Sequence, residues 1–312
     1  MRLLVTRALP PRVETALAAR FETTFRHAEA PLTPDGARAA LAEYDVILPT
    51  LGDAFRAAAF VGPVRARLLA NFGVGTDHID VAAARAAGVA VTNTPGAVTD
   101  ATADIALTLL LMSARRAAEG ERLVRRGAWA GWQPTQMLGA HVTGKHLGVI
   151  GMGRIGQAIA RRAHFGFGMR VSYFNRSEKT LDFPAVRVDL PSAMGADFVV
   201  IAVPGGPATR GLIGAAELAA MAPHGHLINI ARGDVLDEAA LIAALEARRI
   251  GGAGLDVYAR EPEVPAALRA LDNVTLLPHL GTAALEVREA MGMMAHDNLI
   301  AHLEGRPLPN PV

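Results

Sequence analysis

No cysteine occurs among the 312 residues of the sequence, which excludes disulfide bonds, thiolate metal ligands and thiol catalysis. Long apolar runs are also missing, because the longest, Ile105 to Met112, is far shorter than the ~20 residues that span a bilayer. The 31 Lys and Arg residues are balanced by 30 Asp and Glu residues, and no long basic run appears. The segment RLLVT after Met1 indicates a strand and not a signal peptide. These features predict a cytoplasmic protein with no nucleic-acid partner, no membrane partner and no metal.

Short strand-like runs alternate with helical patterns along the chain. The strand RLLVT is followed by a helix expected from Pro10 or Pro11 to about Arg20, and Thr33 is the expected N-cap of the next helix. A longer helix is expected from Thr99 to about Ala118. This alternation predicts an α/β fold with parallel sheets covered on both faces. A hydrophobic content of 51% over 312 residues is enough for two domains.

Two further segments bear on the domain organisation. The stretch GAWAGWQPTQMLG, residues 127–139, contains both tryptophans and shows no clear periodicity. We interpret it as a connector between domains. The last stretch, from about Thr282 to Glu304, has a helical pattern, and a return of this helix to the first domain is compatible with the sequence.

Three glycines, Gly151, Gly153 and Gly156, lie in HLGVIGMGRIGQAIARR, where an apolar strand pattern runs into a turn and then a helical pattern. In such a unit the first glycine permits the tight turn, the second lets the backbone approach a pyrophosphate, and the third lets the helix pack on the strand. The phosphates then lie at a helix N-terminus, which favours anions. A chance glycine-rich loop is the alternative, but the strand and helix flanks favour dinucleotide binding.

The residues after the next strand, MRVSYF, indicate which dinucleotide is bound. An NAD-binding unit places Asp or Glu about 20 residues after the glycines to bond the ribose 2′-hydroxyl. Here the strand is followed by Asn175, Arg176 and Ser177, with no carboxylate at its end. Asn175 and Ser177 can donate hydrogen bonds, and Arg176 can pair with a 2′-phosphate. We therefore predict NADPH, with the alternative that Arg176 is a solvated side chain over the adenine and NADH is still accepted.

Arg232, Glu261 and His279 each follow an apolar, strand-like run: LINIAR, GLDVYAREP and VTLLPH. Reduction of a 2-oxo acid needs a cation that holds the carboxylate and an acid that supplies a proton as hydride arrives. Arg232 offers a planar two-pronged donor. His279 fits the acid, because an imidazole's unperturbed pKa of ~6.5 is close to working pH, and Glu261 is the candidate carboxylate beside it.

Each of these three residues also has a structural interpretation. Arg232 is then a surface ion-pair partner, Glu261 a helix-start residue before Pro262, and His279 a satisfied histidine at a strand end. Taken together they favour a site, because all three follow strand ends, and α/β sheets bind ligands there.

These residues and their surroundings resemble the D-isomer-specific 2-hydroxyacid dehydrogenase family, and the resemblance covers nearly the whole chain. The segments that carry it are NFGVGTDHID at 71–80, NTPGAVTDATADIAL at 93–107, GVIGMGRIG at 148–156, NIARGDVLDE at 229–238, GLDVYAREP at 254–262 and LPHLGTA at 278–284. Within the family, the NRS segment and WQPTQMLGAHVTGK are similar to the glyoxylate/hydroxypyruvate reductases.

The resemblance implies a two-domain α/β fold with the active site in the interdomain cleft. It implies a flavodoxin-like substrate-binding domain from residues 1–98 and 285–312, and a Rossmann NAD(P)-binding domain from 99–284. It also implies a homodimer built around the cofactor domains. Trp129 and Trp132 are then candidates to reach a neighbouring subunit's active site, and packing within the connector is the alternative.

The resemblance also implies roles for single residues. It makes Arg232 the substrate-orienting arginine, His279 the acid/base and Glu261 its partner. Substrate-binding loops are expected at Leu51 and Gly52 and at Val74 and Gly75, the second of which is otherwise a simple strand-to-helix turn. Besides the three glycines and Asn175–Ser177, the implied cofactor-lining residues are Arg154, Ile155, Val203, Pro204, Ala231, Asp256 and Gly281. For Asp256, a buried structural carboxylate is the alternative.

Three functions remain open at this point. The first is NADPH-dependent reduction of small 2-oxo acids such as glyoxylate and hydroxypyruvate. The second is reduction of a bulkier 2-oxo acid, for example 2-ketogluconate or phenylpyruvate, since pocket shape decides the substrate. The third is a non-enzymatic dinucleotide-sensing binding protein, like the transcriptional corepressors that share this fold.

Overall fold

Two parallel β-sheets, each with its own hydrophobic core, organise the chain. The structure is a computed structural model that describes residues 1–312. The chain divides into a first unit, Met1–Val98 with Thr282–Val312, and a second unit, Thr99–Gly281. The chain passes from one unit to the other at Val98–Thr99 and again at Gly281–Thr282.

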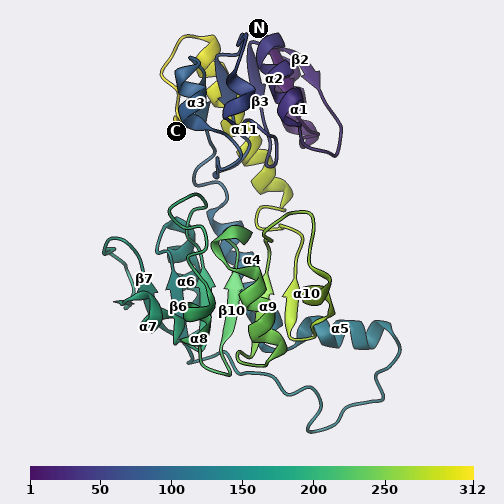
Figure 1. Ribbon diagram of the computed structural model, residues 1–312, viewed down its shortest axis with the longest axis vertical. Coiled ribbons are helices and arrows are strands. Elements are labelled where there is room, and N and C mark those ends of the chain that lie inside the picture. The colour runs from purple at the N-terminus through teal and green to yellow at the C-terminus, as the bar shows by residue number, and fades with distance from the viewer. The chain divides into compact units, whose positions relative to one another are not determined.

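The first unit is a five-stranded parallel sheet with the order β2-β1-β3-β4-β5 (Figure 1). Apolar side chains of α2 and α3 pack on one face of the sheet, and those of α1 and α11 pack on the other. The strands are β1 Arg2–Val5, β2 Glu22–Phe25, β3 Val46–Leu48, β4 Leu68–Ala70 and β5 Ala90–Thr92. The helices are α1 Pro11–Ala18, α2 Pro34–Glu43, the 3-10 helix η1 Ala57–Phe60, α3 Val81–Ala86 and α11 Leu285–Leu303.

The second unit is a seven-stranded parallel sheet with the order β12-β11-β10-β9-β6-β7-β8. Its core strands are fully buried, with α4 and α6 on one face and α8, α9 and α10 on the other (Figure 1). The strands are β6 His146–Ile150, β7 Arg170–Phe174, β8 Val186–Arg187, β9 Phe198–Ile201, β10 His226–Asn229, β11 Gly252–Leu255 and β12 Val274–Leu276. The helices are α4 Thr99–Ala114, α5 Ala117–Arg125, α6 Arg154–Phe167, α7 Leu190–Met194, α8 Ala215–Ala219, the 3-10 helix η2 Gly233–Val235, α9 Glu238–Glu246 and α10 Ala266–Ala270.

The strand orders define where ligands bind in each sheet. In the second unit the order reverses between β6 and β9, and in the first unit it reverses between β1 and β3. In open parallel sheets, ligands bind outside the carboxyl ends of the strands at such a reversal. The order in the second unit is that of the dinucleotide-binding fold, and the order in the first is flavodoxin-like. The predicted α/β class is confirmed.

Several local predictions are confirmed, and two are wrong. The Thr33 side chain accepts a hydrogen bond from Gly36 N–H at 3.2 Å, so it caps α2 as expected. The helix that begins at Thr99, however, ends at Ala114 and not near Ala118. Its last turn is interrupted because Ala140 N–H donates to the Ala114 carbonyl at 2.8 Å and Arg116 takes a left-handed φ of 52°. Helix α5 then starts in a new direction.

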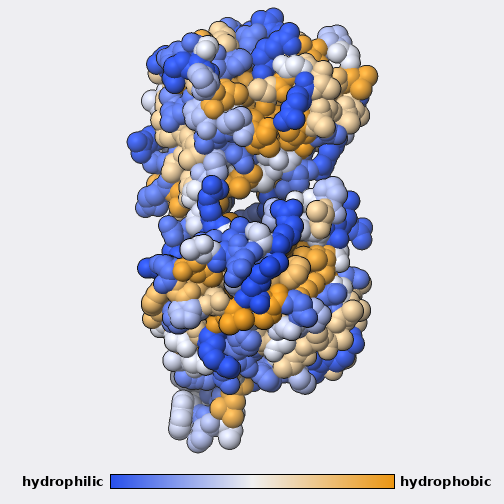
Figure 2. Space-filling view, turned by 90° about the vertical axis from the view of Figure 1, so that its left-hand side faces the viewer, coloured by the Kyte–Doolittle hydropathy of each residue, from blue (hydrophilic) through white to orange (hydrophobic).

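The second wrong prediction concerns residues 127–139, which lie inside the second unit and therefore do not connect the two units. Together with α5 they project from the lower end of the second unit (Figures 1 and 2). Helix α5 has no buried residue. Large apolar side chains are exposed along this segment: Val124, Trp129, Trp132 and Leu138. None of the helices combines the length and the apolar character that crossing a membrane requires.

His226, at the start of β10, makes the stability of the second unit depend on pH. Its ring is buried, stacks on Phe198 and is 2.8 Å from Ser113 Oγ. Burial, with a smaller contribution from His224, lowers its pKa to about 4. The unfolded chain therefore binds a proton at this residue near pH 6.5, whereas the folded chain does not. Stability is lost as the pH falls from about 6.5 towards 4.

We expect the His226→Gln variant to lose this dependence. Between pH 7.5 and pH 5 the wild-type protein should lose about 2 kcal/mol more unfolding free energy than the variant, from the difference between the two pKa values. Urea titrations at both pH values measure the loss, with the exposed His141→Gln as the matched control. Parallel pH profiles for wild type and His226→Gln would contradict the assignment.

Candidate active site

The three glycines form a turn between β6 and α6 at the point where the strand order reverses. Gly151 has a φ of 100°, and a Cβ added there would lie 2.8 Å from the backbone of Ala202. A Cβ on Gly156 would lie 2.0 Å from the Gly151 carbonyl oxygen, so both positions require glycine. A Cβ on Gly153 would meet nothing within 4 Å, and this residue is the N-cap of α6 without any side-chain cap.

This geometry fits a dinucleotide pyrophosphate. The first turn of α6 leaves backbone N–H groups without helical partners, and the helix dipole adds positive potential there. Arg154 is exposed at the first helical position, and no acidic residue lies in the first turn. Gly153 therefore leaves open space for an anion at the N-terminus of α6, a 14-residue helix. The residues present fit the phosphate group of the cofactor that the fold class binds.

The segment after β7 is held by protein contacts on both sides. The Asn175 side chain accepts from Met152 N–H at 3.2 Å and donates to the Ser177 carbonyl at 2.7 Å, so it fixes the glycine turn. Arg187, on β8, donates through Nε to the Asn175 carbonyl at 3.1 Å and through Nη2 to the Arg176 carbonyl at 3.0 Å. Arg176 and Ser177 are exposed. The sequence pattern missed Arg187, because its partners are backbone atoms of the segment after β7, more than ten residues away.

The remaining residues expected along the cofactor also belong to the second unit. Ile155 is in the first turn of α6, and Val203 and Pro204 directly follow β9, the strand beside β6 at the reversal. The Ala202 N–H donates to the Ile150 carbonyl at 2.8 Å, which fixes this end of β9 against the glycine turn. Ala231 is buried after β10.

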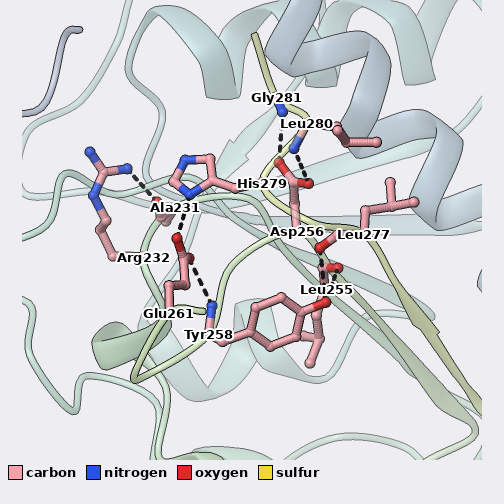
Figure 3. Close-up of polar contacts among 10 residues, drawn as sticks. All are labelled: Ala231, Arg232, Leu255, Asp256, Tyr258, Glu261, Leu277, His279, Leu280 and Gly281. Carbon is pink, nitrogen blue, oxygen red and sulfur yellow. Dashed lines mark hydrogen bonds and ion pairs between the residues drawn. The ribbon is translucent and has the colours of Figure 1, made fainter. Parts of the chain in front are cut away.

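Arg232, Glu261 and His279 come together at the carboxyl edge of the sheet (Figure 3). They follow β10, β11 and β12, which are neighbours in that order. His279 Nδ1 is 2.8 Å from Glu261 Oε2, and Arg232 Nη1 donates to the Ala231 carbonyl at 2.8 Å. The side chains of His279 and Glu261 are 29% and 32% exposed, so both are open to a ligand. The structure therefore brings the three predicted residues into one cluster.

Electrostatics favour a charged carboxylate at Glu261. Burial acts to raise the pKa of Glu261. The hydrogen bond and charge of His279, the N–H of Tyr258 and the charge of Arg232 together outweigh burial and lower this pKa. An ionised Glu261 accepts from Nδ1 of His279, which leaves Nε2 of the ring for a ligand.

Asp256 and Tyr258 support the segment that carries His279. Asp256 is 1% exposed and accepts hydrogen bonds from the N–H groups of Leu280 at 2.6 Å and Gly281 at 2.8 Å. Burial raises the pKa of Asp256. The Tyr258 hydroxyl donates to the Leu277 carbonyl at 2.8 Å (Figure 3). These contacts fit the structural role that the sequence left open for Asp256. They also hold His279, whose φ of 56° is unusual for a residue other than glycine.

Gly233 lets the turn that carries Arg232 contact the segment that leads to Glu261, although no motif in the sequence marks this glycine. A Cβ on Gly233 would lie 1.8 Å from the carbonyl carbon of Tyr258. No other residue fits this contact between the turn after β10 and the segment after β11. Asn229 adds to the turn, because it accepts from Ala231 N–H and donates to the Arg232 carbonyl, both at 3.0 Å.

The two predicted loops of the first unit lie at the carboxyl ends of β3 and β4. Asn71 donates to the carbonyls of Gly73 and Gly75 at 3.0 Å each, and Asn93 donates to the Val74 carbonyl at 2.9 Å. The turn is held in place because asparagine side chains donate hydrogen bonds to these carbonyls. Val74, in this turn, is 37% exposed. After β3, Gly52 has a φ of 96° and is exposed.

The fold and the cluster define a class of protein, the dinucleotide-dependent α/β oxidoreductases. No group of three or more His, Asp or Glu side chains is arranged to hold a metal ion. The family model for the NAD-binding domain of D-isomer-specific 2-hydroxyacid dehydrogenases matches residues 107–281. The chain belongs to this family, and it is an oxidoreductase with a nicotinamide dinucleotide-binding domain.

Individual relatives agree with this assignment. A glyoxylate reductase of Thermococcus gammatolerans is 40% identical, with 100% of this chain and 95% of that protein covered. A hydroxyphenylpyruvate reductase of Plectranthus scutellarioides is 43% identical, with 78% of this chain and 78% of that protein covered. The structure of an NADPH-dependent glyoxylate/hydroxypyruvate reductase of Sinorhizobium meliloti, in complex with NADP and malonate, is similar with a TM-score of 0.87. Its sequence is 36% identical, with 100% of this chain and 96% of that chain covered.

Proposed function

We propose that this protein reduces small 2-oxo acids, glyoxylate and hydroxypyruvate, to 2-hydroxy acids with NADPH. The observation that carries the proposal is the 2.8 Å contact between His279 and Glu261 beside Arg232, at the edge of a sheet that also holds a phosphate-binding glycine turn. A cation, a proton donor and a dinucleotide site are the groups that this reaction needs. The names of the relatives from Thermococcus gammatolerans and Sinorhizobium meliloti favour the same substrates.

Each residue of the cluster has a separate role in the proposed reaction. Arg232 binds the substrate carboxylate and polarises the 2-oxo group through its fork of N–H donors. A reduced nicotinamide, when bound, supplies the hydride that adds to the carbonyl carbon. His279 donates the proton on Nε2 to the carbonyl oxygen, which becomes the hydroxyl group. Glu261 keeps the ring oriented through its contact with Nδ1.

The two units have different tasks in this proposal. The second unit is the NAD(P)-binding domain, lined by the glycine turn and by the residues after β7, β9 and β10. The first unit is the substrate-binding domain. The N–H groups of Val74 and Gly75 bind the substrate carboxylate, and Leu51 and Gly52 form the second substrate loop. Asn71 and Asn93 support these roles, because they occupy the carbonyls of the turn and leave its N–H groups for an anion.

Arg176 selects NADPH in this proposal. Its side chain is exposed after β7, its backbone carbonyl accepts a hydrogen bond from Arg187, and no carboxylate stands at the end of the strand. We expect Arg176→Ala to raise the Michaelis constant for NADPH roughly 10- to 100-fold, because a charged hydrogen bond to the 2′-phosphate is lost. The constant for NADH should change less than about twofold, since NADH has no 2′-phosphate. Steady-state kinetics with both cofactors measure the ratio.

The matched control for this test is Arg170→Ala, an exposed arginine at the opposite end of the same strand. It should leave both Michaelis constants unchanged. Equal effects of Arg176→Ala on NADPH and NADH would show that the 2′-phosphate is held elsewhere.

The protein is proposed to act as a homodimer. Trp129 and Trp132 are 53% and 79% exposed in the segment after α5. Large aromatic side chains exposed together are typical of surfaces that a protein partner covers. A second copy of this chain is the partner that the family favours.

Reduction of a bulkier 2-oxo acid is the second candidate function. The observation in its favour is the 43% identity to the hydroxyphenylpyruvate reductase of Plectranthus scutellarioides. Pocket shape decides between the two candidates.

Initial rates of NADPH and NADH oxidation test the proposal. The panel comprises glyoxylate, hydroxypyruvate, pyruvate, phenylpyruvate and 2-ketogluconate. The proposal predicts that NADPH with glyoxylate and hydroxypyruvate gives the highest kcat/KM. A preference for phenylpyruvate or 2-ketogluconate would replace it with the second candidate, and absence of turnover with every acid would overturn both.

A further inference from the structure

Arg7 lies where the strand order of the first unit reverses. It follows β1 by two residues, and β3, the strand beside β1 at the reversal, leads directly to Leu51 and Gly52. In a sheet of this order, the carboxyl ends of these two strands are where ligands bind. Arg7 therefore lies next to the proposed substrate loop, although no motif in the sequence marks it.

The guanidinium of Arg7 is partly buried and has no partner of its own. Its Nε is buried without a hydrogen-bond partner. Other arginines of the first unit form ion pairs with carboxylates: Arg2, Arg12, Arg20, Arg38 and Arg65. Arg7 forms none. Leaving a charged donor unsatisfied in a buried position costs free energy, so a group retained in this state calls for an explanation.

The carboxylate next to this loop is already saturated by other donors. Asp53 is fully buried and accepts from Thr6 Oγ1 at 2.5 Å, from Thr50 N–H at 2.8 Å and from Leu32 N–H at 2.7 Å. These bonds fix the loop that contains Gly52. Asp53 thus shapes the loop and forms no ion pair with Arg7.

Gly52 leaves the guanidinium accessible. A Cβ on Gly52 would lie 3.4 Å from Nη2 of Arg7, and the φ of 96° at this residue favours glycine. With no side chain at position 52, this edge of the guanidinium is not covered by the loop.

Strand spacing gives the distance from Arg7 to the proposed carboxylate-binding turn. Val74 and Gly75 follow β4, which is separated from β1 by β3 alone. Neighbouring strands lie about 4.8 Å apart, so β1 and β4 are roughly 10 Å apart. Arg7, with its long side chain, is therefore within reach of the far end of a 2-oxo acid whose carboxylate binds at Val74 and Gly75 and whose carbon chain extends along this edge of the sheet.

We propose that Arg7 is a specificity-determining residue that binds an oxygen-bearing tail of the substrate. The inference rests on the proposed 2-oxo acid reduction. Among 2-oxo acids of similar size that have a tail beyond the carbonyl carbon, those with a hydroxyl or carboxylate group are then preferred over those with an alkyl tail, because a guanidinium bonds such acceptors and gains little from an alkyl group. Glyoxylate has no tail and does not contact Arg7.

Matched substrates and variants test the role of Arg7. Hydroxypyruvate and 2-oxobutanoate differ by a hydroxyl in place of a methyl group, and 2-oxoglutarate is compared with 2-oxohexanoate. We expect Arg7→Met to lower kcat/KM for hydroxypyruvate and 2-oxoglutarate roughly 10- to 100-fold, mainly through KM. Values for glyoxylate and the two alkyl acids should change less than about threefold. Arg7→Lys keeps the charge without the fork and should give intermediate selectivity.

The controls separate the possible outcomes. Arg12→Met, at an exposed arginine of the same unit, should leave kcat/KM unchanged for every substrate. If Arg7→Met lowered kcat/KM equally for all acids, Arg7 would be only structural. If it lowered kcat/KM for none of them, the tail would be bound elsewhere. Either result overturns the role of Arg7 while wild-type turnover of glyoxylate still supports the proposed function. Absence of wild-type turnover with every acid overturns the proposed function itself. If Arg7→Met does not fold, Arg7→Lys with the same substrate pairs decides the question.

Discussion

Replacing His279 with Ala should lower kcat for glyoxylate by roughly 10²- to 10⁴-fold, the range that a positioned general acid contributes. His279 Nδ1 is 2.8 Å from Glu261 Oε2, so Nε2 is the nitrogen that we propose delivers the proton. The glycine turn at Gly151–Gly156, which we propose binds the cofactor phosphates, follows β6, another strand of the same sheet. The dissociation constant for NADPH should therefore change by less than about threefold. Stopped-flow or steady-state kinetics and a fluorescence titration of NADPH measure the two effects.

A second His–Glu pair provides the control. His27 Nε2 is 3.2 Å from Glu14 Oε1 in the first unit, and its side chain is 59% exposed. His27→Ala removes an imidazole from a similar pair and should leave turnover unchanged. If His279→Ala retained wild-type turnover, the proton would come from another group and the assignment would be wrong.

Replacing Arg232 with Lys should lower kcat/KM for glyoxylate roughly 10²- to 10³-fold. The substitution keeps one positive charge but loses the two-pronged donor that holds the carboxylate and polarises the carbonyl. KM should rise and kcat should fall, because the same group binds the substrate carboxylate and stabilises the developing negative charge. Steady-state kinetics with saturating NADPH give the split between the two constants.

Arg210→Lys is the matched control for Arg232→Lys. Arg210 is an exposed arginine of the same unit and is paired with Asp234 at 3.2 Å. The control variant should behave as the wild type. A change of less than about threefold in Arg232→Lys would place carboxylate recognition on other residues.

The sequence predicts those parts of the site whose residues are close together or follow strand ends. The turn at Gly151–Gly156 is readable because a strand and a helix flank it within one short segment. Arg232, Glu261 and His279 are separated in sequence, but each follows an apolar run. Since β10, β11 and β12 are parallel neighbours, their carboxyl ends meet at one edge.

Contacts between backbone segments could not be predicted in this way. Gly233 appears ordinary in the sequence, yet its missing side chain allows the turn of Arg232 to contact the backbone at Tyr258. Arg187 acts on the carbonyls of Asn175 and Arg176 from β8, and a two-residue edge strand has no clear pattern. Both depend on tertiary packing, and residue type alone does not show it.

The end of helix α4 and the domain organisation also depend on tertiary contacts that the sequence does not show. The pattern from Thr99 continues past Ala114, but Ala140 N–H takes the carbonyl that the next helical turn would use. A residue 26 positions away thus ends the helix. The aperiodic stretch 127–139 suggested a connector, whereas the crossings between units occur at Val98–Thr99 and Gly281–Thr282, where the chain has no loop of unusual composition.

Transfer of an isotope label from cofactor to product tests whether the protein reduces a 2-oxo acid by hydride transfer from NADPH. The wild-type protein is incubated with hydroxypyruvate and NADPH that carries deuterium at both C4 positions of the nicotinamide. The product is then analysed by mass spectrometry and chiral chromatography. We expect glycerate of the D configuration with one deuterium, bonded to C2, and a hydroxyl proton from solvent. Glycerate without deuterium, or no glycerate at all, would contradict it.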